Sequence, residues 1–405
     1  MQIIPTNGHT EAQSPQVLPF TLKPRVLVSR GVKPSDPTTF HLEEVRDYLA
    51  KLEKLQDPVD HDRSLDQLHV AFSGKHMTGR FLRHDGISDE VLLVTDTGAS
   101  QLSRDVLPSR FFSGLKTLAQ MDESGEKLAT LVWAKFSGKK ETVRMVRTIR
   151  MKVSGQVYRA IRSCHSQGYA PYSNLQFVQD LLDHAGHFAE LPVLDWRVAD
   201  NGLRLRFAGI DKELSVLRHW DGGDSGDGVI PLNEPIPMIE CWNSETGQRR
   251  VGLRGGMFKL VCTNGMGHWD DKREWNWIHR GSASRIQDGV RSAFEDILTS
   301  ANGVVEAYQQ ALNVSIDDTF AWMEAELHHQ KVPERVITAA QTALTDPTTT
   351  EGGSLASVVD ALTLIAQQED MFQQYELERS ASRILRRGLS QSLKTGGSLL
   401  AQLGM

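Results

Sequence analysis

The sequence predicts an α+β protein with an antiparallel or mixed β-rich body, flanking helices and a helical C-terminal part. Three observations lead to this class. Segments that favour β structure, separated by charged turns, run through residues 66–160. Apolar residues and arginines alternate at residues 203–207, which is the period of a strand. Beyond Ser282, apolar residues instead recur at steps of three and four, which is the period of a helix.

The N-terminal region is predicted to be an extended arm followed by one helix. Residues 1–39 carry six prolines among polar residues, which predicts an extended arm with a single strand at 25–28. Leucines at helical spacing predict a helix over 41–55, which ends before Asp57-Pro58. An arm of this kind often docks on a neighbouring chain.

The body is expected to contain several strands and one internal helix. The expected strands are at 90–95, 128–136, 203–207, 236–242 and 258–261, and the expected helix is at 174–184. At 203–207, Arg204 and Arg206 alternate with apolar residues, which predicts a strand with only one buried face.

The C-terminal region predicts a run of helices. Apolar residues from Ile286 to Leu312 predict one long amphipathic helix. Four further helices are expected at about 317–330, 334–344, 354–368 and 370–387. The expected domains are a 1–39 arm, a 40–280 α+β body, a 281–388 helical part and a 389–405 flexible tail.

Composition limits the classes of function. Apolar residues make up 40% of the 405 residues and charged residues 24%, which is ordinary globular usage. The formal net charge of -6 gives no overall attraction to nucleic acid, so such binding needs a local basic patch. Three scattered cysteines fit a reducing compartment, here the cytoplasm. No apolar run is long enough to cross a membrane, so no membrane partner is expected.

A basic segment is the main candidate binding site. Residues 135–162 hold nine lysines and arginines and one glutamate. If residues 143–153 form a strand, Arg144, Arg150 and Lys152 share one exposed face that could follow a phosphate backbone. Nearby tyrosines could stack on bases or belong to the core, and the basic face could equally be a solvated surface. The candidate nucleic-acid-binding residues are Lys139, Lys140, Arg144, Arg147, Arg150, Lys152, Tyr158, Arg159, Arg162 and Tyr169.

A second candidate is the motif Cys262-Thr263-Asn264-Gly265-Met266. Asn264-Gly265 is a strong turn signal, so a buried cysteine that ends a strand at a tight turn is the simplest interpretation. The alternatives are a nucleophilic Cys262 paired with His268 or His279, and a turn whose backbone amides bind phosphate.

The segment 268–279 is rich in tryptophan and in possible metal ligands. The spacing of His268, Asp270, Asp271, Glu274 and His279 matches no standard metal site, so neither a metal nor a cofactor is expected. The interleaved tryptophans predict core packing ahead of a surface for a base or a protein partner. The glycine- and aspartate-rich residues 221–228 predict a solvated loop ahead of a calcium site.

Several short motifs follow one another along the chain in an order that is typical of one family. They are YRAIRS at 158–163 leading to Tyr169 and Asn174, then Asn243-Ser244 with Gly247, then 262–266, then DALT at 360–363, Ala366, YELE at 375–378 and Ala381. Together they resemble the phage and plasmid family catalogued as domain of unknown function 932, over about residues 125–388. The resemblance implies a mobile-element setting and a fold type, and it assigns no catalytic residue.

Three classes of function remain open. The first is a nucleic-acid-binding protein of a phage or plasmid, with single-stranded DNA as its ligand and a homo-oligomeric role in recombination or annealing. The second is an assembly or anti-defence factor that binds another protein through the arm and the tryptophan-rich segment. The third is an enzyme, either a cysteine-dependent hydrolase or a metal-dependent nuclease, and the sequence leans against it.

Overall fold

A computed structural model gives the fold and confirms the α+β class. The structure describes residues 26–31, 39–73, 76–81, 92–108, 111–137, 142–153, 156–184, 191–199, 202–209, 235–259, 266–281, 283–346, 353–369, 371–395 and 398–399.

The chain divides into two compact units, which are described separately. The first comprises the described part of Pro58–Gln167, and the second the described parts of Arg25–Asp57 and Gly168–Met405. The expected 40–280 body is therefore split between two units, and its second half shares a unit with the C-terminal helices.

A six-stranded mixed sheet forms the centre of the first unit. Its strand order is β2-β6-β7-β5-β4-β3, in which β5 and β7 run parallel and the other described neighbours run antiparallel. The strands are β2 (Val59–Ser64), β3 (Leu68–Ser73), β4 (His76–Phe81), β5 (Leu92–Val94), β6 (Val143–Val153) and β7 (Gln156–Ser166). A 3₁₀ turn, Leu65–Gln67, joins β2 to β3.

Three helices share an apolar core with this sheet: α2 (Asp96–Val106), α3 (Phe111–Ala119) and α4 (Glu123–Ser137). Leu102 and Trp133 from the helices meet Val146 and Ile161 from the strands in that core. Thr95 caps α2 by accepting a hydrogen bond from the Gly98 amide at 3.1 Å, which satisfies one of the free amides of the first turn.

The predicted strand at 128–136 is wrong, because these residues lie in α4. Asp122 Oδ1 accepts a hydrogen bond from the Gly125 amide at 2.7 Å and starts the helix. Every fourth residue from Gly125 through Ala129 to Trp133 is then buried. Leu128 and Leu131 are exposed on another side of the helix, so apolar residues on more than one side hide the helical period in the sequence.

An antiparallel six-stranded sheet forms the centre of the second unit, in the order β1-β8-β9-β10-β11-β12. The strands are β1 (Val26–Gly31), β8 (Val193–Ala199), β9 (Gly202–Ala208), β10 (Pro235–Asn243), β11 (Val251–Lys259) and β12 (Met266–Trp277). β1 confirms the strand expected at 25–28, and the rest of the expected arm lies outside the described residues.

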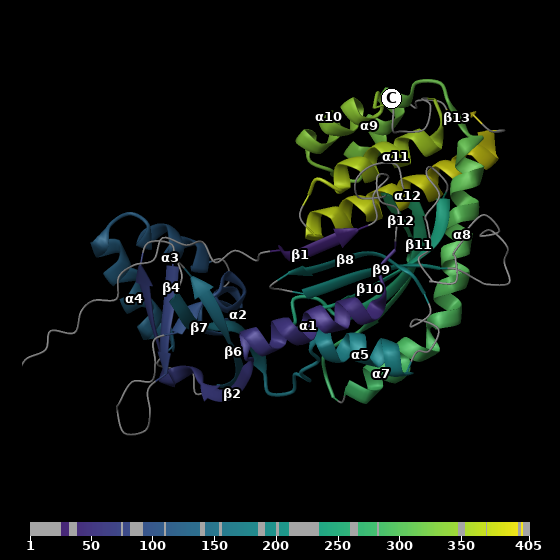
Figure 1. Cartoon of the computed structure of the whole chain (residues 1–405). Helices are drawn as coiled ribbons and strands as arrows, with labels where there is room; N and C mark the ends of the chain where they lie inside the picture. Colours follow the sequence, from purple (N-terminus) through teal and green to yellow (C-terminus); the bar gives the residue numbers. More distant parts are fainter. Residues whose placement is uncertain are drawn as a thin grey trace, which may run out of the picture. The chain divides into compact units, whose positions relative to one another are not determined.

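Helices cover both faces of this sheet. Figure 1 shows α1 (Leu42–Gln56), α5 (Asn174–His184) and α7 (Ala283–Ser292) on one side, and α11 (Leu355–Ala366) and α12 (Met371–Thr395) on the other. α1 and α5 confirm the helices predicted at 41–55 and 174–184. Their apolar residues, such as Leu42 and Phe177, pack against Leu205 and Leu253 of the sheet.

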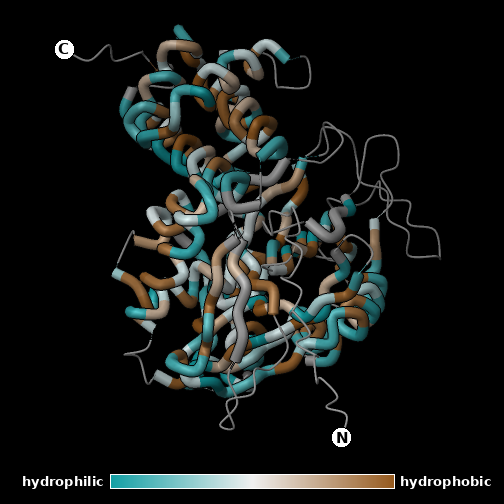
Figure 2. The backbone as a smooth tube through the Cα atoms, turned by 90° about the vertical axis from the view of Figure 1, so that its left-hand side faces the viewer, coloured by the Kyte–Doolittle hydropathy of each residue, from teal (hydrophilic) through white to brown (hydrophobic). Residues whose placement is uncertain are grey.

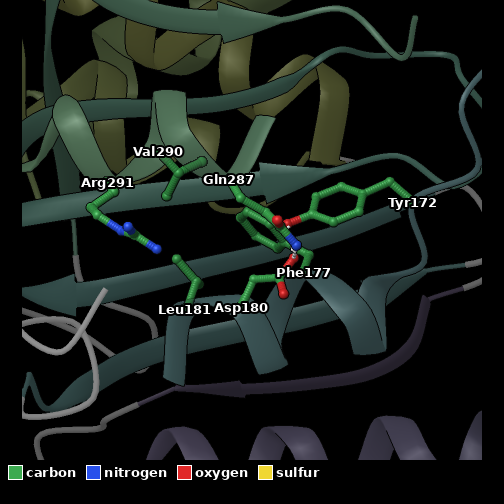
Figure 3. A pocket seen from close by; sticks show the side chains of 7 residues that line it. All are labelled: Tyr172, Phe177, Asp180, Leu181, Gln287, Val290 and Arg291. Atoms are coloured by element: carbon green, nitrogen blue, oxygen red, sulfur yellow. Dashed lines mark hydrogen bonds between the residues drawn. The ribbon is translucent and has the colours of Figure 1, made fainter. Parts of the chain in front are cut away.

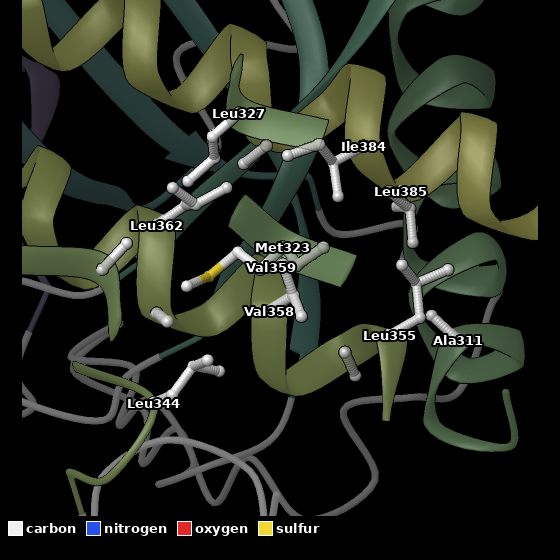
Figure 4. Close-up of a cluster of buried hydrophobic side chains, with 14 of the residues drawn as sticks. Ala311, Met323, Leu327, Leu344, Leu355, Val358, Val359, Leu362, Ile384 and Leu385 are labelled. Atoms are coloured by element: carbon white, nitrogen blue, oxygen red, sulfur yellow. The ribbon is translucent and has the colours of Figure 1, made fainter. Parts of the chain in front are cut away.

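The C-terminal helices enclose a second core within the same unit. α8 (Phe294–Leu312), α9 (Thr319–His329), α10 (Glu334–Ala343), α11 and α12 surround Met323, Val359 and Leu362, whose side chains point toward one another in Figure 4. Hydrophobic and hydrophilic residues alternate along these helices in Figure 2, which is the pattern that predicts them from sequence. All four helices expected after residue 312 are confirmed.

Two boundaries differ from the sequence prediction. The single long helix expected over 286–312 is two helices, because α7 ends at Ser292 and α8 begins at Phe294. Ile286, Val290, Ile297 and Ala301 are buried on both sides of the break, so the apolar period continues through it. The expected 389–405 tail is in part ordered, since α12 continues to Thr395 and Leu399 is buried in β14 (Ser398–Leu399), beside β13 (Ser315–Ile316). Among the described helices, none has the length and apolar character needed to span a bilayer.

Candidate nucleic-acid interface and buried charge ladder

The basic segment predicted from sequence lies mainly on β6 and β7. The described residues of these strands carry six cationic side chains and no acidic one. They are Arg144, Arg147, Arg150, Lys152, Arg159 and Arg162. Lys139 and Lys140 lie outside the described residues.

Two of these arginines belong to the fold of the first unit. Arg144 donates from Nε and Nη2 to the Asp105 carboxylate at 2.8 and 3.0 Å, and Arg147 donates to both oxygens of Asp60 at 2.7 Å. Arg147 and Arg162 are buried. The expected exposed face is therefore wrong for Arg144, because its carboxylate partner comes from α2 and Val146, on the same face, is in the core. Arg150 and Lys152 are exposed as expected.

The far half of the β6–β7 hairpin extends beyond the neighbouring strands. In the described structure, β2 pairs with β6 up to Thr148, and β5 pairs with β7 at Ala160 and Ile161. Past these positions, β6 and β7 continue to pair with each other as far as Val153 and Gln156. Residues 149–153 and 156–159 thus form a two-stranded projection, termed here the hairpin arm.

One face of the hairpin arm is cationic. The register places Arg150 opposite Arg159 and Lys152 opposite Val157, and residues opposite each other share a face. Val157 is 65% exposed, and Arg159 is half-buried with Nη1 donating to Thr148 Oγ1 at 3.1 Å. Like charges directly opposite each other destabilise a sheet by about 0.2–1 kcal/mol. An anion bound at this face would offset that repulsion.

The tyrosines of the candidate set do not join this face. Tyr158 is opposite Met151 on the other face of the arm, and its hydroxyl bonds Gln156 Oε1. Tyr169 belongs to the second unit, where it stacks on His279 at 5.1 Å between ring centroids and donates to the Glu245 carbonyl at 3.1 Å. Tyr172 is a core residue, and burial together with its hydrogen bond to Asp180 raises its pKa.

The Asn243-Ser244 motif joins the end of β10 to the start of α5. Asn243 Nδ2 donates to the Tyr172 carbonyl and to Asn174 Oδ1, both at 3.0 Å. The Asn174 amide donates in turn to the Glu245 carboxylate. Through these hydrogen bonds, the motif residues Asn174 and Asn243 connect elements of the fold. Cys262, Thr263, Asn264 and Gly265 lie outside the described residues, between the end of β11 and the start of β12.

A row of alternating charges crosses five strands of the second sheet, which the sequence analysis missed. Its members oppose one another directly in the ladder of strand pairs: Asp195 on β8, Arg206 on β9, Glu240 on β10, Arg254 on β11 and Glu274 on β12. This row is termed the charge ladder. It lies on the sheet face opposite the one that packs on α1 and α5, because Leu205 and Leu253 point to that other face.

Helix α12 closes the charge ladder with a further carboxylate. Arg206 donates to Glu240 at 2.9 Å and to Glu378 of α12 at 2.6 Å. Arg254 donates to Glu240 at 2.7 Å and to Glu378 at 3.3 Å. These four residues are at most 2% exposed. The two guanidiniums and two carboxylates therefore form a closed buried set.

Neighbouring residues extend this contact between sheet and helix. Arg204 donates to Asp195 and to Gln374 of α12, both at 2.7 Å. The Tyr375 ring lies between two guanidiniums, with Arg249 at 4.0 Å and Arg254 at 4.4 Å from its centroid. Its hydroxyl donates to Glu274 at 2.8 Å.

The charges of the ladder are maintained by their partners. Burial opposes the ionisation of Glu240, but Arg254 and Arg206 outweigh it and lower the Glu240 pKa to about 2. Burial likewise disfavours the charged form of Arg206, but the carboxylates of Glu378 and Glu240 outweigh it and raise the Arg206 pKa. Burial raises the pKa of Tyr375 to about 12, so this hydroxyl remains a donor at neutral pH.

The strand predicted at 203–207 is confirmed as part of β9, but the prediction that only one of its faces is buried is wrong. All seven residues of β9 are buried, because the apolar side chains face one core and Arg204 and Arg206 face the carboxylates under α12. A sequence signal was present: Glu240 is the single charge of β10, and Arg254 is the single charge in the interior of β11. Such isolated charges in strands indicate pairing across a sheet.

A second buried polar group lies at the end of β11. Lys259 Nζ donates to Tyr308 Oη and Asp360 Oδ2, both at 3.0 Å, and the Tyr308 hydroxyl donates to Asp360 at 2.9 Å. Asp360 begins the DALT motif, and Tyr375 and Glu378 lie in the YELE motif. The motif residues of the C-terminal helices are thus the polar partners of the sheet.

In a small pocket between α5 and α7, the one carboxylate, that of Asp180, is bonded to neighbouring side chains. Figure 3 shows Asp180 between Tyr172 and Gln287, with Phe177, Leu181, Val290 and Arg291 around it. Asp180 accepts hydrogen bonds from Tyr172 at 2.6 Å, Gln287 at 2.7 Å and Gln176 at 2.8 Å. This carboxylate therefore serves to join the two helices.

The tryptophan-rich segment forms β12. Trp275 and Trp277 pack against the core of the second unit, which confirms the packing prediction for these two side chains. The structure does not describe the side chains of His268, Trp269, Asp270 and Asp271. Over the part of the chain that the structure describes, no three His, Cys, Asp or Glu side chains are grouped so that they could hold a metal ion.

Comparison of the chain with protein-family models, with curated proteins and with solved structures gave no match in any of the three. The resemblance to the phage and plasmid family therefore rests on the motif residues alone.

Proposed function

We propose that this chain binds nucleic acid through the cationic face of the hairpin arm. The observation that carries the proposal is the concentration of Arg150, Lys152 and Arg159 on one face of a projection without an acidic residue. Cationic side chains that neutralise phosphates release condensed counterions, which drives binding. Since the whole chain has a net charge of -6, this attraction is local.

The biological setting is a further part of the proposal. The motif resemblance supports a phage or plasmid setting. Together with the cationic arm, it leads us to propose a DNA-binding role in recombination or annealing in the host cytoplasm. The support for binding is the cationic face of the arm, whereas Cys262 and the side chains of His268, Asp270 and Asp271 lie outside what the structure describes.

Charge reversal on the arm tests the binding site. The double variant Arg150→Glu/Lys152→Glu is expected to abolish binding of a fluorescent DNA in an anisotropy titration. For three phosphate contacts, wild-type affinity is expected to fall about 40-fold between about 50 and 200 mM salt. Arg144 is left unchanged, because its replacement would break the pair with Asp105 and act on the fold.

The matched control places the same charge change elsewhere. Lys51 and Lys54 are exposed on α1, so Lys51→Glu/Lys54→Glu alters the net charge equally without touching the arm. It is expected to keep wild-type affinity to within about twofold, since neither lysine belongs to the proposed cationic face. Unimpaired binding by the arm variant, or equal loss in both variants, would show that the arm is not the site.

Self-association is the second part of the proposal, and α3 and α4 support it. Large apolar side chains are exposed there: Phe111, Met121, Leu128, Leu131 and Phe136. Leu128 and Leu131 lie three positions apart on α4 and so share one side of the helix. Exposed apolar groups that lie together often mark contacts between proteins. We therefore expect a homo-oligomer that forms through α3 and α4.

Light scattering after gel filtration tests this expectation. Wild type is expected to have a multiple of the mass of one chain, and Leu128→Glu/Leu131→Glu the mass of one chain, because buried charge destabilises an apolar interface. Leu55→Glu/Leu393→Glu is the control, since both leucines are exposed on other helices. A wild type with the mass of one chain would contradict the proposed self-association and would leave the proposed nucleic-acid binding untouched.

A further inference from the structure

The hairpin arm has the dimensions of an element that enters a DNA groove. Paired strands lie about 4.8 Å apart. The major groove of B-DNA is about 12 Å wide and admits a two-stranded β-ribbon. Ile149 at the base of the arm is buried, so the part of β6 that is free to enter a groove is residues 150–153. These four residues extend about 13 Å, which exceeds the groove depth of about 8.5 Å. The arm is therefore long and narrow enough to reach the floor of a groove.

The arm also has the side chains that a groove requires. Arg150 and Lys152 on β6 and Arg159 on β7 place long cationic side chains on both strands of the ribbon. Inside a groove such side chains lie close to the phosphates of both DNA strands. Val157, on the same face and 65% exposed, supplies an apolar group of the kind that contacts thymine methyl groups.

A single strand would need a different surface. Proteins that hold single strands combine cationic grooves with aromatic side chains on which bases stack. The cationic face of the arm carries Arg150, Lys152, Val157 and Arg159, and none of these is aromatic. Tyr158 points to the other face, and its hydroxyl is bonded to Gln156. The stacking partner expected from sequence is missing from this face.

We infer that the nucleic acid bound by the arm is a duplex, which the arm enters through a groove. This inference rests on the proposed nucleic-acid binding and replaces the single-stranded ligand expected from the sequence. In this role, the arm recognises the shape of the groove and the phosphates that line it.

Anisotropy titrations with the full chain test the inference. The probes are a labelled duplex of about 20 base pairs and each of its two single strands at the same salt concentration. The duplex is expected to bind at least about tenfold more tightly than either strand, because only the duplex offers a groove. Tyr158→Ala is expected to change duplex affinity by less than about twofold.

The outcomes separate the inference from the proposal beneath it. If single strands bind as tightly as the duplex, or if Tyr158→Ala weakens binding about tenfold or more as loss of a stacked base would, the duplex inference is wrong. The proposed function then stands as long as Arg150→Glu/Lys152→Glu abolishes that binding. If wild type binds neither probe, both are wrong. Unchanged thermal unfolding of each variant shows that the fold is intact.

Discussion

Replacing Glu378 by Gln is expected to lower the free energy of unfolding of the second unit by about 3–5 kcal/mol. Glu378 is 1% exposed and accepts hydrogen bonds from Arg206 and Arg254. The amide keeps the shape of the side chain but removes its charge. Both buried guanidiniums then lose a carboxylate partner, and Glu240 and, at 3.9 Å from Arg206, Asp195 compensate them less well. Urea denaturation followed by far-UV circular dichroism measures the change.

Glu376 provides a matched control on the same helix. It lies two residues before Glu378, and its side chain is exposed. Glu376→Gln removes the same charge from α12 and is expected to change stability by about 0.5 kcal/mol or less, as is usual for exposed positions. Equal effects of the two replacements would mean that the charge ladder contributes nothing beyond general helix electrostatics.

Gly255→Ala is expected to destabilise the second unit by about 3 kcal/mol, at the upper end for an overpacked site. A Cβ atom at Gly255 would lie 2.5 Å from the Ile297 carbonyl oxygen and 2.6 Å from the Ala301 amide nitrogen of α8. These are backbone atoms, so a rotamer change cannot relieve the clash and the helix itself must move. Thermal and urea unfolding measure the loss.

Gly303 is the corresponding control within α8. A Cβ atom there would meet nothing within 4 Å. Gly303→Ala is therefore expected to stabilise the protein by about 0.5–1 kcal/mol, because alanine loses less conformational entropy in a helix. If Gly255→Ala proved as harmless as Gly303→Ala, the close approach of α8 to β11 would not limit the sequence at this position.

The helices were the part of the fold that the sequence predicted best. α1, α5 and the helices from α9 to α12 present apolar residues at a regular helical spacing toward one side, and that spacing is visible without a structure. α4 was misassigned because Leu128 and Leu131 break this rule by facing solvent. The division into two units depends on which distant strands pair, and local patterns carry no such information.

The candidate site was predicted in part. The sequence located the basic strands correctly, and Arg150 and Lys152 are exposed as expected. It could not show that Arg144 pairs with Asp105, because the two residues are 39 positions apart in the chain. It also treated Arg204 and Arg206 as solvated, since an alternating strand has the same pattern whether its polar face meets water or a buried set of carboxylates.

The charge ladder limits the alignments in which the strands of the second sheet can pair. A slip of β9 by one residue would turn its leucines to the wrong face, so the apolar pattern excludes it. A slip by two keeps each side chain on its own face, and the apolar pattern does not exclude it. In one direction, such a slip would bring Arg206 opposite Arg197, and in the other it would leave Arg206 opposite Met238. Buried charges thereby select one alignment from those that hydrophobicity alone permits.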